Sequence, residues 1–560
     1  MQYYGPWEWN PVRGEFELCG DKEHHGSGEI SAVEAFRHST IFLLGTTGFL
    51  GKVLLATLLD RFPELMRLVL LVRRKKAVSG EQRFYSEILP SPPLRPTVAK
   101  LGEEHIRQRV RILEGDLSER FCGLGEPHLA ELKGKVDVVV NTAGLVEFDP
   151  PLNESLLTNV YGIQNLIELV QRLGAKLVHI STCYVAGKKS GRIPENTPIV
   201  GYYPERKSPH DRRFQVTQEL AWCEKFICGT RGEESPGRES PSAQSENPPQ
   251  DSPGEQRPPR LVREELRQGG TARAQSWGWI NTYTYTKSMG EQLIASTPGL
   301  PYCLVRPAIV ESAMRFPFPG WNEGLTTSAP LVLMGGEGVK SWPVRRDGPL
   351  EIIPVDLVAT GILIAIAATL CGKNKPVYHL ATANDNPVMS PRLVAFLGMN
   401  ARYKHKHKKT GNRLANLWKT YVETQVVSFE QLQARRARLH RGLDLYHAAL
   451  NFLRLILGHR IVAPYLRSLR ATRRQIRRQE QTLDQFLPFM IHNSFVFETG
   501  NIRESFKRLT EEDRQRLCWD PENIDWADYW VNIHTKGIEK WIRPVFVKPG
   551  SPPDAASFHS

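Results

Sequence analysis

Short, almost uniformly apolar runs recur over the first two thirds of the chain, and segments with helical spacing of apolar residues separate them. Runs that are apolar on both faces predict strands of a parallel sheet that is covered by helices on both sides. The predicted strands are 41–44, 68–72, 110–113, 136–140, 176–180, 303–306 and 377–380, and the main predicted helices are 48–61, 153–172, 284–295 and 355–371. This alternation predicts an α/β fold with a doubly wound, Rossmann-type parallel sheet, whose ligand site lies at the carboxyl ends of the strands.

The alternation stops near residue 385, and the remainder has mostly helical spacing. We therefore expect a polar lead-in over 1–38 with a short helix at 31–37, a sheet domain over 39–384, a mainly helical C-terminal domain over 385–545 and a tail over 546–560. One segment interrupts the sheet domain. Residues 229–260 are rich in Pro, Ser, Glu, Gln and Gly and hold no aliphatic side chain larger than alanine, which predicts a disordered insertion.

The positive charge is concentrated in the helical C-terminal region. The whole chain carries a net charge of +13, whereas residues 401–480 alone contain 19 Lys and Arg against 4 Asp and Glu. This local excess predicts an anionic partner, either a phosphate-rich substrate, a lipid surface or nucleic acid. No recognised nucleic-acid-binding module lies there, so we expect no nucleic-acid partner. Within the region, the apolar stretch 443–461 fits either a core helix beside a solvated basic helix or a helix lying on an anionic membrane.

Cysteine usage and the N-terminus indicate the compartment. The eight cysteines are scattered without a C-x-x-C pair, so the sequence predicts neither a metal site nor a disulfide framework, and it favours a reducing compartment. The N-terminus shows no basic segment followed by an apolar one, and therefore no signal peptide. The apolar run 355–370 is too short to span a bilayer and follows Pro354 as a buried helix does. We expect a cytoplasmic protein with peripheral membrane contact through 401–480.

The first apolar run ends in a glycine turn. Gly45 is followed at three-residue steps by Gly48 and Gly51, and a helical pattern begins there. Strand, glycine turn and helix form the context of a dinucleotide-binding fingerprint, although the spacing here is G-x-x-G-x-x-G. Gly45 allows the tight turn, Gly48 lets backbone N–H groups approach a pyrophosphate, and Gly51 lets the helix pack closely. Three glycines alone also fit a purely structural turn, but the flanking strand and helix favour a nucleotide.

Residues after the next strands indicate which nucleotide binds. Arg73 ends the second strand about twenty residues after Gly51, where NAD enzymes tend to place an acidic residue for the ribose 2′-hydroxyl. A basic residue there suits a 2′-phosphate and favours NADPH, the alternative being a basic surface loop. Asp116, after the third strand, suits either an adenine contact or a turn. Small residues after the fourth strand, including Ala143 and Gly144, let a cofactor lie against the backbone.

A serine and a threonine, Ser181 and Thr182, follow the fifth strand, and a Y-x-x-x-K pair opens the helix after the insertion. Tyr283 and Lys287 are four residues apart and therefore share a helix face. An ammonium beside a phenol favours the phenolate, so we predict that Lys287 lowers the pKa of Tyr283 and prepares it for proton transfer. The Thr182 hydroxyl can hydrogen-bond the same substrate oxygen. Y-x-x-x-K alone is common on surface helices, but its place after a nucleotide turn indicates a catalytic pair.

These residues resemble the extended short-chain dehydrogenase/reductases and, among them, the alcohol-forming fatty acyl-CoA reductases. The resemblance covers about residues 36–545, and its specific parts are 45–51, 71–73, 144–149, 179–185, 281–287, 306–310, 318–322, 525–530 and Gly537. The insertion before Tyr283 and the set Asn141-Thr142-Ala143-Gly144 depart from the commoner pattern. The C-terminal membrane span of some animal members is not visible.

The resemblance implies that 39–384 is an NADPH-binding reductase domain acting on a long-chain acyl-CoA. NADPH would deliver hydride to the thioester carbonyl, Tyr283 would donate a proton with help from Thr182, and Lys287 would also bind the nicotinamide ribose. Coenzyme A would leave an aldehyde, which a second NADPH reduces to a primary alcohol. Asn159 is a weaker candidate for ordering a proton-relay water. The predicted cofactor contacts are Gly45, Thr47, Gly48, Phe49, Leu50, Gly51, Arg73, Asp116, Leu117, Ala143, Gly144, Tyr283, Lys287 and Pro307.

Three alternatives stay open at this point. The reaction can stop at the aldehyde. A nucleotide-sugar epimerase or dehydratase shares the tyrosine–lysine site, but such enzymes usually prefer NAD, so Arg73 and the basic helical region count against one. A non-catalytic lipid or scaffold protein on the same fold is disfavoured by the intact Thr182, Tyr283 and Lys287.

Overall fold

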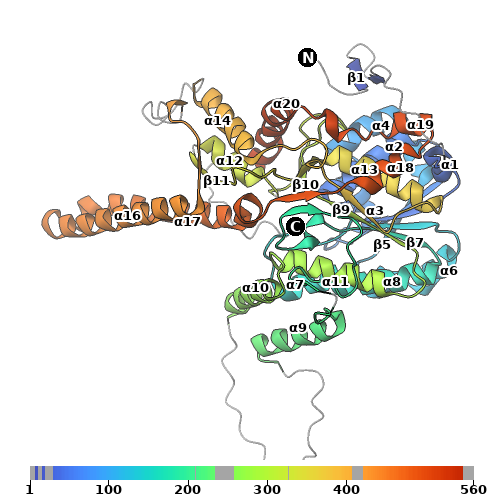
Figure 1. Cartoon of the computed structure of the whole chain (residues 1–560), viewed down its shortest axis with the longest axis horizontal. Helices are drawn as coiled ribbons and strands as arrows, with labels where there is room; N and C mark the ends of the chain where they lie inside the picture. Colours follow the sequence, from blue (N-terminus) through green and yellow to red (C-terminus); the bar gives the residue numbers. More distant parts are fainter. Residues whose placement is uncertain are drawn as a thin grey trace, which may run out of the picture.

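The computed structural model describes residues 7–10, 15–18, 29–208, 210–233, 258–325, 327–337, 339–406 and 420–546. Its centre is a seven-stranded, wholly parallel sheet (Figure 1). The strands are β3 (Thr40–Leu44), β4 (Arg67–Val72), β5 (Val110–Glu114), β6 (Val138–Asn141), β7 (Lys176–Ile180), β9 (Tyr302–Pro307) and β13 (Val377–Leu380). All seven strands predicted from the apolar runs are confirmed.

The strand order across the sheet is β13-β9-β7-β6-β3-β4-β5. From β3 the chain moves outward through β4 to β5, and then returns to place β6 on the other side of β3. The direction of winding therefore reverses between β3 and β6, and a ligand crevice of a doubly wound fold lies at the carboxyl ends of such a strand pair. The predicted fold class is confirmed.

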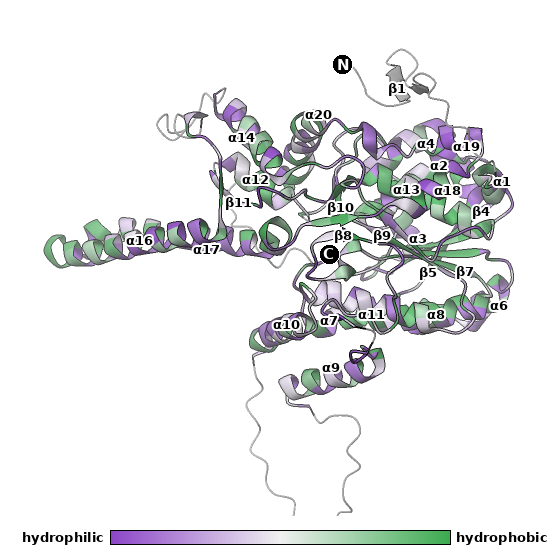
Figure 2. Cartoon of the chain, viewed as in Figure 1, coloured by the Kyte–Doolittle hydropathy of each residue, from purple (hydrophilic) through white to green (hydrophobic). Residues whose placement is uncertain are grey.

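The two faces of the sheet carry separate hydrophobic cores. Along β3, Ile41 and Leu43 point into one core, and Phe42 and Leu44 point into the other. The first core includes α1 (Ala32–Arg37), α2 (Phe49–Arg61) and α13 (Val355–Leu370), and the second includes α8 (Gly162–Leu173) and part of α11 (Thr282–Ser296). Figure 2 shows the resulting hydrophobic strands between two helical layers. The four main predicted helices and the short helix before β3 are confirmed, and α13 is a buried core helix.

Smaller elements complete this domain. They are α3 (Gly80–Arg83), α4 (Arg95–Leu101), α5 (Glu103–Arg109), α6 (Glu126–Leu132), α7 (Leu152–Leu156), the π-helical turn η4 (Leu157–Tyr161), the 3-10 turn η5 (Cys183–Ala186), α9 (Val216–Arg231), α10 (Pro259–Ser276) and α12 (Ala329–Glu337). The predicted disordered insertion is too wide at both ends, because α9 continues to Arg231 and α10 begins at Pro259. Residues 234–257 lie outside the described part, so disorder there stays a prediction.

The C-terminal region is mainly helical, as predicted, but it consists of two unlike parts. After α14 (Ser390–Lys406), α16 (Phe429–Leu457) and α17 (His459–Leu487) form a helical hairpin that projects from the body (Figure 1). Residues 488–546, here called the docked segment, then return to the body. They contain β15 (Phe495–Phe497), α18 (Gly500–Lys507), α19 (Glu511–Arg516), α20 (Trp526–Asp528), η8 (Tyr529–His534), α21 (Thr535–Gly537), η9 (Ile538–Ile542) and α22 (Arg543–Phe546).

The docked segment is interleaved with the sheet domain. β15 pairs with β8 (Gly191–Ile193), and α18 packs on α13 and β13. The Asp513 carboxylate accepts hydrogen bonds from the backbone amides of Ala32, at 2.7 Å, and Val33, at 3.0 Å, and so caps α1 from 480 residues away. Gly320 and Gly537 touch backbone to backbone, since a Cβ on Gly537 would overlap the Gly320 carbonyl. The predicted boundary at 384/385 therefore separates sequence patterns, and these contacts cross it.

The apolar stretch 443–461 is not a core helix, and that interpretation was wrong. The stretch contains Gly458, whose φ of +81° ends α16 and starts α17, so it forms the free end of the hairpin. Most of its large apolar side chains are exposed. The basic tract 403–409 belongs partly to α14, and its last three residues lie outside the described part.

Candidate active site

The glycine turn lies where the winding of the sheet reverses. A Cβ on Gly45, which has a φ of +89°, would come within 2.5 Å of the Ala143 amide nitrogen at the end of β6. A Cβ on Gly51 would overlap the Gly45 carbonyl oxygen, so α2 packs directly against the turn. Gly48 is exposed and caps α2 without any side chain, and the first turn of α2 holds no acidic residue. The turn therefore presents free backbone N–H groups and a helix N-terminus, which suits a pyrophosphate.

The other predicted contacts of this turn differ in exposure. Thr47 is exposed, whereas Phe49 and Leu50 are partly buried and pack on the core beneath the turn. Thr46 was not predicted. Its hydroxyl is buried without a hydrogen-bond partner among the described residues, which is the kind of group that a bound phosphate can satisfy.

The predicted adenosine residues lie together at the carboxyl ends of β4 and β5. Arg73 is 71% exposed, and its guanidinium lies 3.5 Å from the Asp116 carboxylate. Asp116 also accepts hydrogen bonds from the amide and the hydroxyl of Ser118, at 2.9 and 2.8 Å, so it forms the turn that the sequence left open. Leu117 is buried beside it. A mostly exposed guanidinium next to a turn carboxylate can meet both a ribose phosphate and an adenine amino group.

The end of β6 brings small residues against Lys287, which is predicted to be catalytic. The Ala143 amide donates to Asn141 Oδ1 at 3.0 Å, which fixes the turn after the strand. A Cβ on Gly144 would lie 3.5 Å from Lys287 Nζ and 3.4 Å from Asn159 Oδ1. Asn159 lies in η4 and holds both backbone groups of Leu145, at 3.1 and 3.2 Å. Its amide thus positions this loop, and single π-helical turns of this kind are frequent at functional sites.

Helix α11 places the tyrosine and the lysine. Its first turn is fixed by a capping box, in which Asn281 Oδ1 accepts from the Thr284 amide at 3.0 Å. Lys287 is buried and its ammonium donates to the Ile180 carbonyl at the end of β7, at 2.8 Å. Thr182 follows two residues later, and its hydroxyl hydrogen-bonds the Tyr283 phenol. The structure therefore brings together the three residues predicted to be catalytic.

The pKa values at this site differ from the prediction. Burial raises the pKa of Tyr283 to about 12, and the hydrogen bond with Thr182 only partly opposes it. Lys287 makes no contribution to that pKa here, so the predicted lowering is absent and burial dominates. Burial lowers the pKa of Lys287 to about 8. His179, beside Lys287, is buried and has a pKa well below its ordinary range, first because of burial and then because of the lysine charge.

Two neighbours of the site, Ser181 and Arg306, are not among the site residues predicted from the sequence. Ser181 has a buried hydroxyl with no hydrogen-bond partner among the described residues, and its place beside Thr182 was the signal for it. Pro307, a predicted cofactor contact, ends β9 and is buried. The preceding Arg306 makes a buried, two-bond pair with Glu291 of α11, at 2.8 and 2.5 Å. This pair fastens α11 to β9 and so keeps Lys287 in place.

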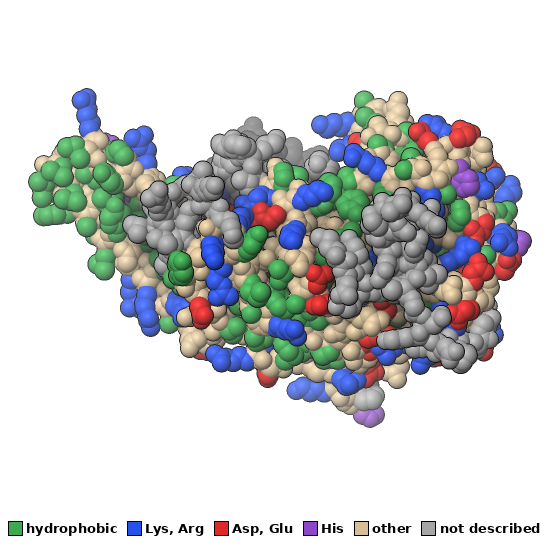
Figure 3. Space-filling view, turned by 90° about the horizontal axis from the view of Figure 1, so that it is seen from above, with side chains coloured by type: hydrophobic (Ala, Val, Ile, Leu, Met, Phe, Trp, Pro, Cys, Tyr) green, Lys and Arg blue, Asp and Glu red, His purple; other side chains and the backbone are tan. Residues whose placement is uncertain are grey.

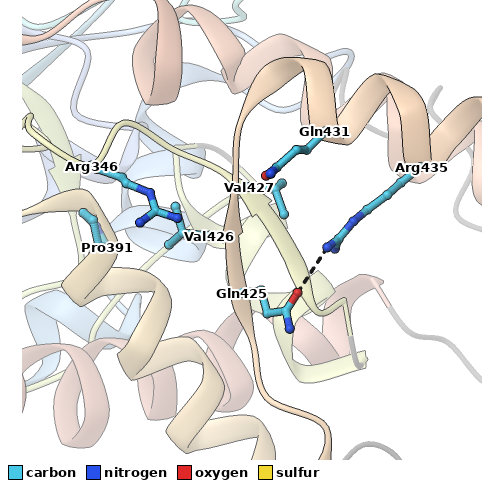
Figure 4. Close-up of a pocket in the computed structure, with 7 residues that line it drawn as sticks. All are labelled: Arg346, Pro391, Gln425, Val426, Val427, Gln431 and Arg435. Atoms are coloured by element: carbon cyan, nitrogen blue, oxygen red, sulfur yellow. Dashed lines mark hydrogen bonds between the residues drawn. The ribbon is translucent and has the colours of Figure 1, made fainter.

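Hollows of the described surface lie beside the site and away from it. One of about 180 Å³ adjoins the residues predicted to be catalytic and is lined by Cys183, Ser288 and Arg306, among others. A wider hollow of about 590 Å³ lies at the base of the hairpin, where Arg346 and Arg435 flank Gln425 (Figure 4). Arg435 donates to Gln425 Oε1 at 3.1 Å. None of the residues predicted to bind the cofactor or to be catalytic lines the wider hollow.

The groups that can carry chemistry at this site are a phenol, an ammonium and hydroxyls. Within the described residues, no three His, Cys, Asp or Glu side chains gather as they would around a metal ion. The chemistry-bearing groups are instead a phenol, an ammonium and hydroxyls at the carboxyl end of a doubly wound sheet, which is where such a fold binds a dinucleotide.

Comparison with known proteins gives a consistent family. A family model described as male sterility protein, of the NAD-binding type, matches residues 43–362, and a second model with the same description matches 445–543. The probable fatty acyl-CoA reductase 4 of Arabidopsis thaliana is 27% identical over 91% of this chain and 99% of its own length. The alcohol-forming fatty acyl-CoA reductase of Simmondsia chinensis is 24% identical over 91% and 99%, respectively.

Among solved structures, the terminal R domain of the myxalamid PKS-NRPS pathway is similar, with 17% identity and a TM-score of 0.48 over 87% of this chain and 89% of that one. The sequence matches carry the assignment. Since the first family model alone spans more than half of the chain, the protein belongs to the male sterility protein family, and its resemblance to the fatty acyl-CoA reductases is confirmed.

Proposed function

We propose that the protein reduces a long-chain acyl-CoA to the primary alcohol, with NADPH as reductant and an aldehyde as intermediate. The observation that carries the proposal is the convergence of Thr182, Tyr283 and Lys287 at the end of β7, beside a glycine turn built for a pyrophosphate. Family membership supplies the substrate class, because the relatives that match over nearly the whole chain are named fatty acyl-CoA reductases.

The chain offers a complete set of groups to hold NADPH, which when bound supplies hydride. The turn from Gly45 to Gly51 would hold the pyrophosphate, and Arg73 would bind the 2′-phosphate. Asp116 and Leu117 would line the adenine, while Ala143, Gly144 and Pro307 would lie along the nicotinamide half. Support for NADPH over NADH comes from Arg73, whose mostly exposed guanidinium lies at the end of β4 where an acidic residue would favour NAD.

The tyrosine acts as the acid. Because burial holds the pKa of Tyr283 near 12, the phenol keeps its proton at neutral pH and can donate it to the carbonyl oxygen of the thioester as hydride reaches the carbonyl carbon. Thr182 hydrogen-bonds the same oxygen. The carbon–sulfur bond then breaks, and coenzyme A leaves as the thiol. The oxygen of the resulting aldehyde is then held by the same two hydroxyl groups, those of Tyr283 and Thr182. Tyr283 must be reprotonated before the second reduction gives the alcohol.

Lys287 would act at the cofactor. With a pKa of about 8, its ammonium is mostly charged at neutral pH and would bind the nicotinamide ribose hydroxyls while it keeps its hydrogen bond to Ile180. The buried pair of Arg306 and Glu291 holds the helix that carries it. We also propose that the protein works in the cytoplasm, with the basic region 401–480 in peripheral contact with a membrane.

The test is a stoichiometry. Purified protein is given palmitoyl-CoA and NADPH, and NADPH oxidation, thiol release and the extracted lipid products are measured. We expect two NADPH per coenzyme A and a fatty alcohol as product. Consumption of one NADPH per coenzyme A, with an accumulating aldehyde, would leave the site assignment unchanged and limit the reaction to its first reduction. No oxidation with any acyl-CoA, together with tightly retained NAD, would replace the proposal by a nucleotide-sugar epimerase or dehydratase.

Replacing the acid tests the mechanism. Tyr283→Phe should lower kcat by at least about 100-fold, because proton donation contributes that much or more, while NADPH binding persists. Tyr421→Phe is a matched control, since Tyr421 is 74% exposed and lies in the C-terminal region, outside the predicted reductase domain. Undiminished turnover in Tyr283→Phe would remove this residue as the acid.

Replacing the predicted phosphate ligand tests the cofactor choice. Arg73→Ala should raise the KM for NADPH about tenfold or more and leave that for NADH nearly unchanged, because one charge-assisted contact to a phosphate is lost. Arg120→Ala is the control, as this side chain is 76% exposed and pairs with Glu168. An equal rise of KM for NADPH and NADH would contradict the assignment of Arg73 to the 2′-phosphate.

A further inference from the structure

The helical hairpin is a stiff, self-contained arm. Polar and ionic contacts link its two helices along their length, namely Arg436 with Asp484 at 2.8 Å, His440 with Glu480 at 3.0 Å and Arg473 with Asp444 at 2.7 Å. Nearer the free end, Leu450, Val462, Leu466 and Leu469 form a small hydrophobic core between the helices. The arm therefore holds its shape without help from the body, and its free end at Gly458 is carried away from it (Figure 1).

The free end of the arm is apolar and uncovered. We call the exposed side chains of this end the apolar tip, and they are Phe452, Leu453, Leu455, Ile456, Leu457, Ile461 and Tyr465. Leu455 is 80% exposed, Phe452 64% and Ile456 63%. Figures 2 and 3 show this hydrophobic cluster at the end of the hairpin. A cluster of solvent-exposed apolar side chains of this size marks a binding site for an apolar partner.

The distribution of the tip residues identifies what covers them. Leu455, Ile456 and Leu457 are consecutive, so their side chains point about 100° apart around the helix. A groove on another protein covers one stripe of a helix, with contacts at every third or fourth residue. A tip whose apolar side chains point in several directions around the helix is covered instead by a medium that closes around it, and a lipid bilayer does so.

Behind the tip the surface becomes strongly basic. The two helices of the hairpin carry twelve arginines and no lysine, against four acidic residues. Arg467, Arg470 and Arg474 are exposed and take part in no ion pair within the described residues. At 1.5 Å per residue, Arg467 and Arg470 lie about 14 and 18 Å from Gly458 along α17. Arginines at that distance meet the headgroups when the tip lies roughly 10 Å deep, and they complement an anionic leaflet.

Two arginines lie within the tip itself. Arg454 and Arg460 are exposed on either side of Gly458. Their aliphatic stems can lie against the apolar side chains while the guanidinium groups extend back to the lipid phosphates. No described helix is long and apolar enough to cross a bilayer. The arrangement therefore fits shallow insertion into one leaflet.

We propose that the apolar tip inserts end-on into the anionic leaflet of a membrane, with the arginines behind it on the lipid headgroups. The hairpin thus tethers the protein and sets the distance between the body and the lipid surface. The binding itself is independent of the reductase activity; only its consequence, delivery of the acyl chain from the membrane and return of the alcohol to it, rests on the proposed function.

Vesicle binding by the full-length protein tests this, without substrate or cofactor. The wild type should co-sediment with vesicles of phosphatidylcholine and phosphatidylserine, and much less with pure phosphatidylcholine. The variant Phe452→Ser, Leu455→Ser, Ile456→Ser should bind at least tenfold more weakly. Leu261→Ser is the matched control, because Leu261 is 60% exposed on α10, far along the chain from the hairpin, and this variant should bind like the wild type.

The charge can be tested separately. Arg467→Gln, Arg470→Gln and Arg474→Gln together should remove most of the preference for anionic vesicles and most of the sensitivity of binding to salt. A tryptophan introduced as Phe452→Trp should be quenched by brominated lipid acyl chains, which reports insertion and not mere adsorption.

Three results would overturn the proposal. The serine variant could bind vesicles as tightly as the wild type, or the Phe452→Trp fluorescence could be untouched by brominated chains. Thirdly, the wild type could fail to bind vesicles and form an oligomer in light scattering, while the serine variant is monomeric. In that case a second copy of the chain covers the tip. Turnover of acyl-CoA in vesicle-free buffer should be the same in the serine variant and the wild type, so a failed tether is distinguishable from a failed reductase.

Discussion

The hairpin and the docked segment are consecutive in the sequence and mostly helical, yet they treat their apolar side chains in opposite ways. In the docked segment Tyr529, Trp530 and Ile538 are at most 2% exposed, whereas Leu455 of the hairpin is 80% exposed. The docked segment has a partner surface in the sheet domain, whereas the outer part of the hairpin, beyond its base, packs its buried side chains only on one another. Apolar content therefore does not separate core from interface here; what does is whether the fold brings a second surface to the helix.

Polar groups make the same contrast. The docked segment buries His534 against hydroxyls of the sheet domain, with Ser312 Oγ at 2.9 Å and Ser328 Oγ at 3.0 Å. Glu311 closes the network, since it accepts from the Thr327 hydroxyl at 3.1 Å and the Ser328 amide at 3.0 Å. On the hairpin, charged pairs stay at the surface. The docked segment thus contributes to the stability of the folded body, whereas the outer part of the hairpin contributes little to it.

The largest expected effect is on the free energy of unfolding, and it is measured by removing one aromatic side chain from each of the two regions. Trp530→Ala should cost about 3–5 kcal/mol in the free energy of unfolding, because it leaves a cavity in a closely packed interface. Phe452→Ala, at the exposed tip, should cost less than about 0.5 kcal/mol. Urea unfolding of both full-length variants measures this. Equal losses would mean that the hairpin is folded against the body in solution, and the contrast would fail.

The second prediction concerns pH. Burial raises the pKa of Glu311 from 4.5 to about 8, so between these values the folded state binds a proton that the unfolded state has lost. Stability should therefore fall as pH rises through this window, by at most about 1.4 kcal/mol per pH unit for this one group. Glu195 and Glu351, whose pKa values burial raises to about 7, act in the same direction.

Glu311→Gln should flatten this dependence, because the amide mimics the protonated carboxyl and does not titrate. Asp444→Asn on the hairpin, where the carboxylate is 70% exposed, should leave the slope as it is. Melting temperatures measured across the window decide between them. A slope that responds to Asp444 and not to Glu311 would reverse the assignment of the two regions.

The smallest expected effect comes from shortening the arm. Removing residues 446–471 and joining the helices by a short Gly-Ser turn just beyond the pair of Asp444 and Arg473 should move the melting temperature by no more than about 2 °C, since among the described residues the buried apolar side chains of that part form a cluster of their own. Turnover of acyl-CoA in vesicle-free buffer should be unchanged. A collapse in either quantity would show that the hairpin end belongs to the catalytic body.

The sheet could be predicted from the sequence because its strands are short, apolar on both faces and separated by helices. The same holds for the glycine turn and for Tyr283 and Lys287, since their spacing has a direct geometric meaning. The docked segment could not be placed, because β8 and β15 are each three residues long and pair across some three hundred positions. Apolar spacing in 443–461 predicts a helix and says nothing of whether a partner surface faces it.

The site showed the same limit. Sequence spacing put Lys287 on the same helix face as Tyr283, but the lysine's hydrogen bond to Ile180 and the depth of burial decide the pKa values. Those depend on how β7 ends and on the pair of Arg306 and Glu291, which are tertiary features. The sequence does not single out Ser181, because only burial distinguishes its hydroxyl, which has no partner among the described residues, from that of an ordinary strand-end serine.

The cap that Asp513 places on α1 has a consequence for synthesis. A ribosome makes the chain from its N-terminus, so α1 and the first strands emerge long before the carboxylate that caps Ala32 and Val33. Until almost the whole chain has been translated, this edge of the core lacks its closing partner, and such late, long-range contacts make folding slow and expose the nascent chain to aggregation. Any chain cut before Asp513 is therefore an unfinished fold and a natural client for chaperones.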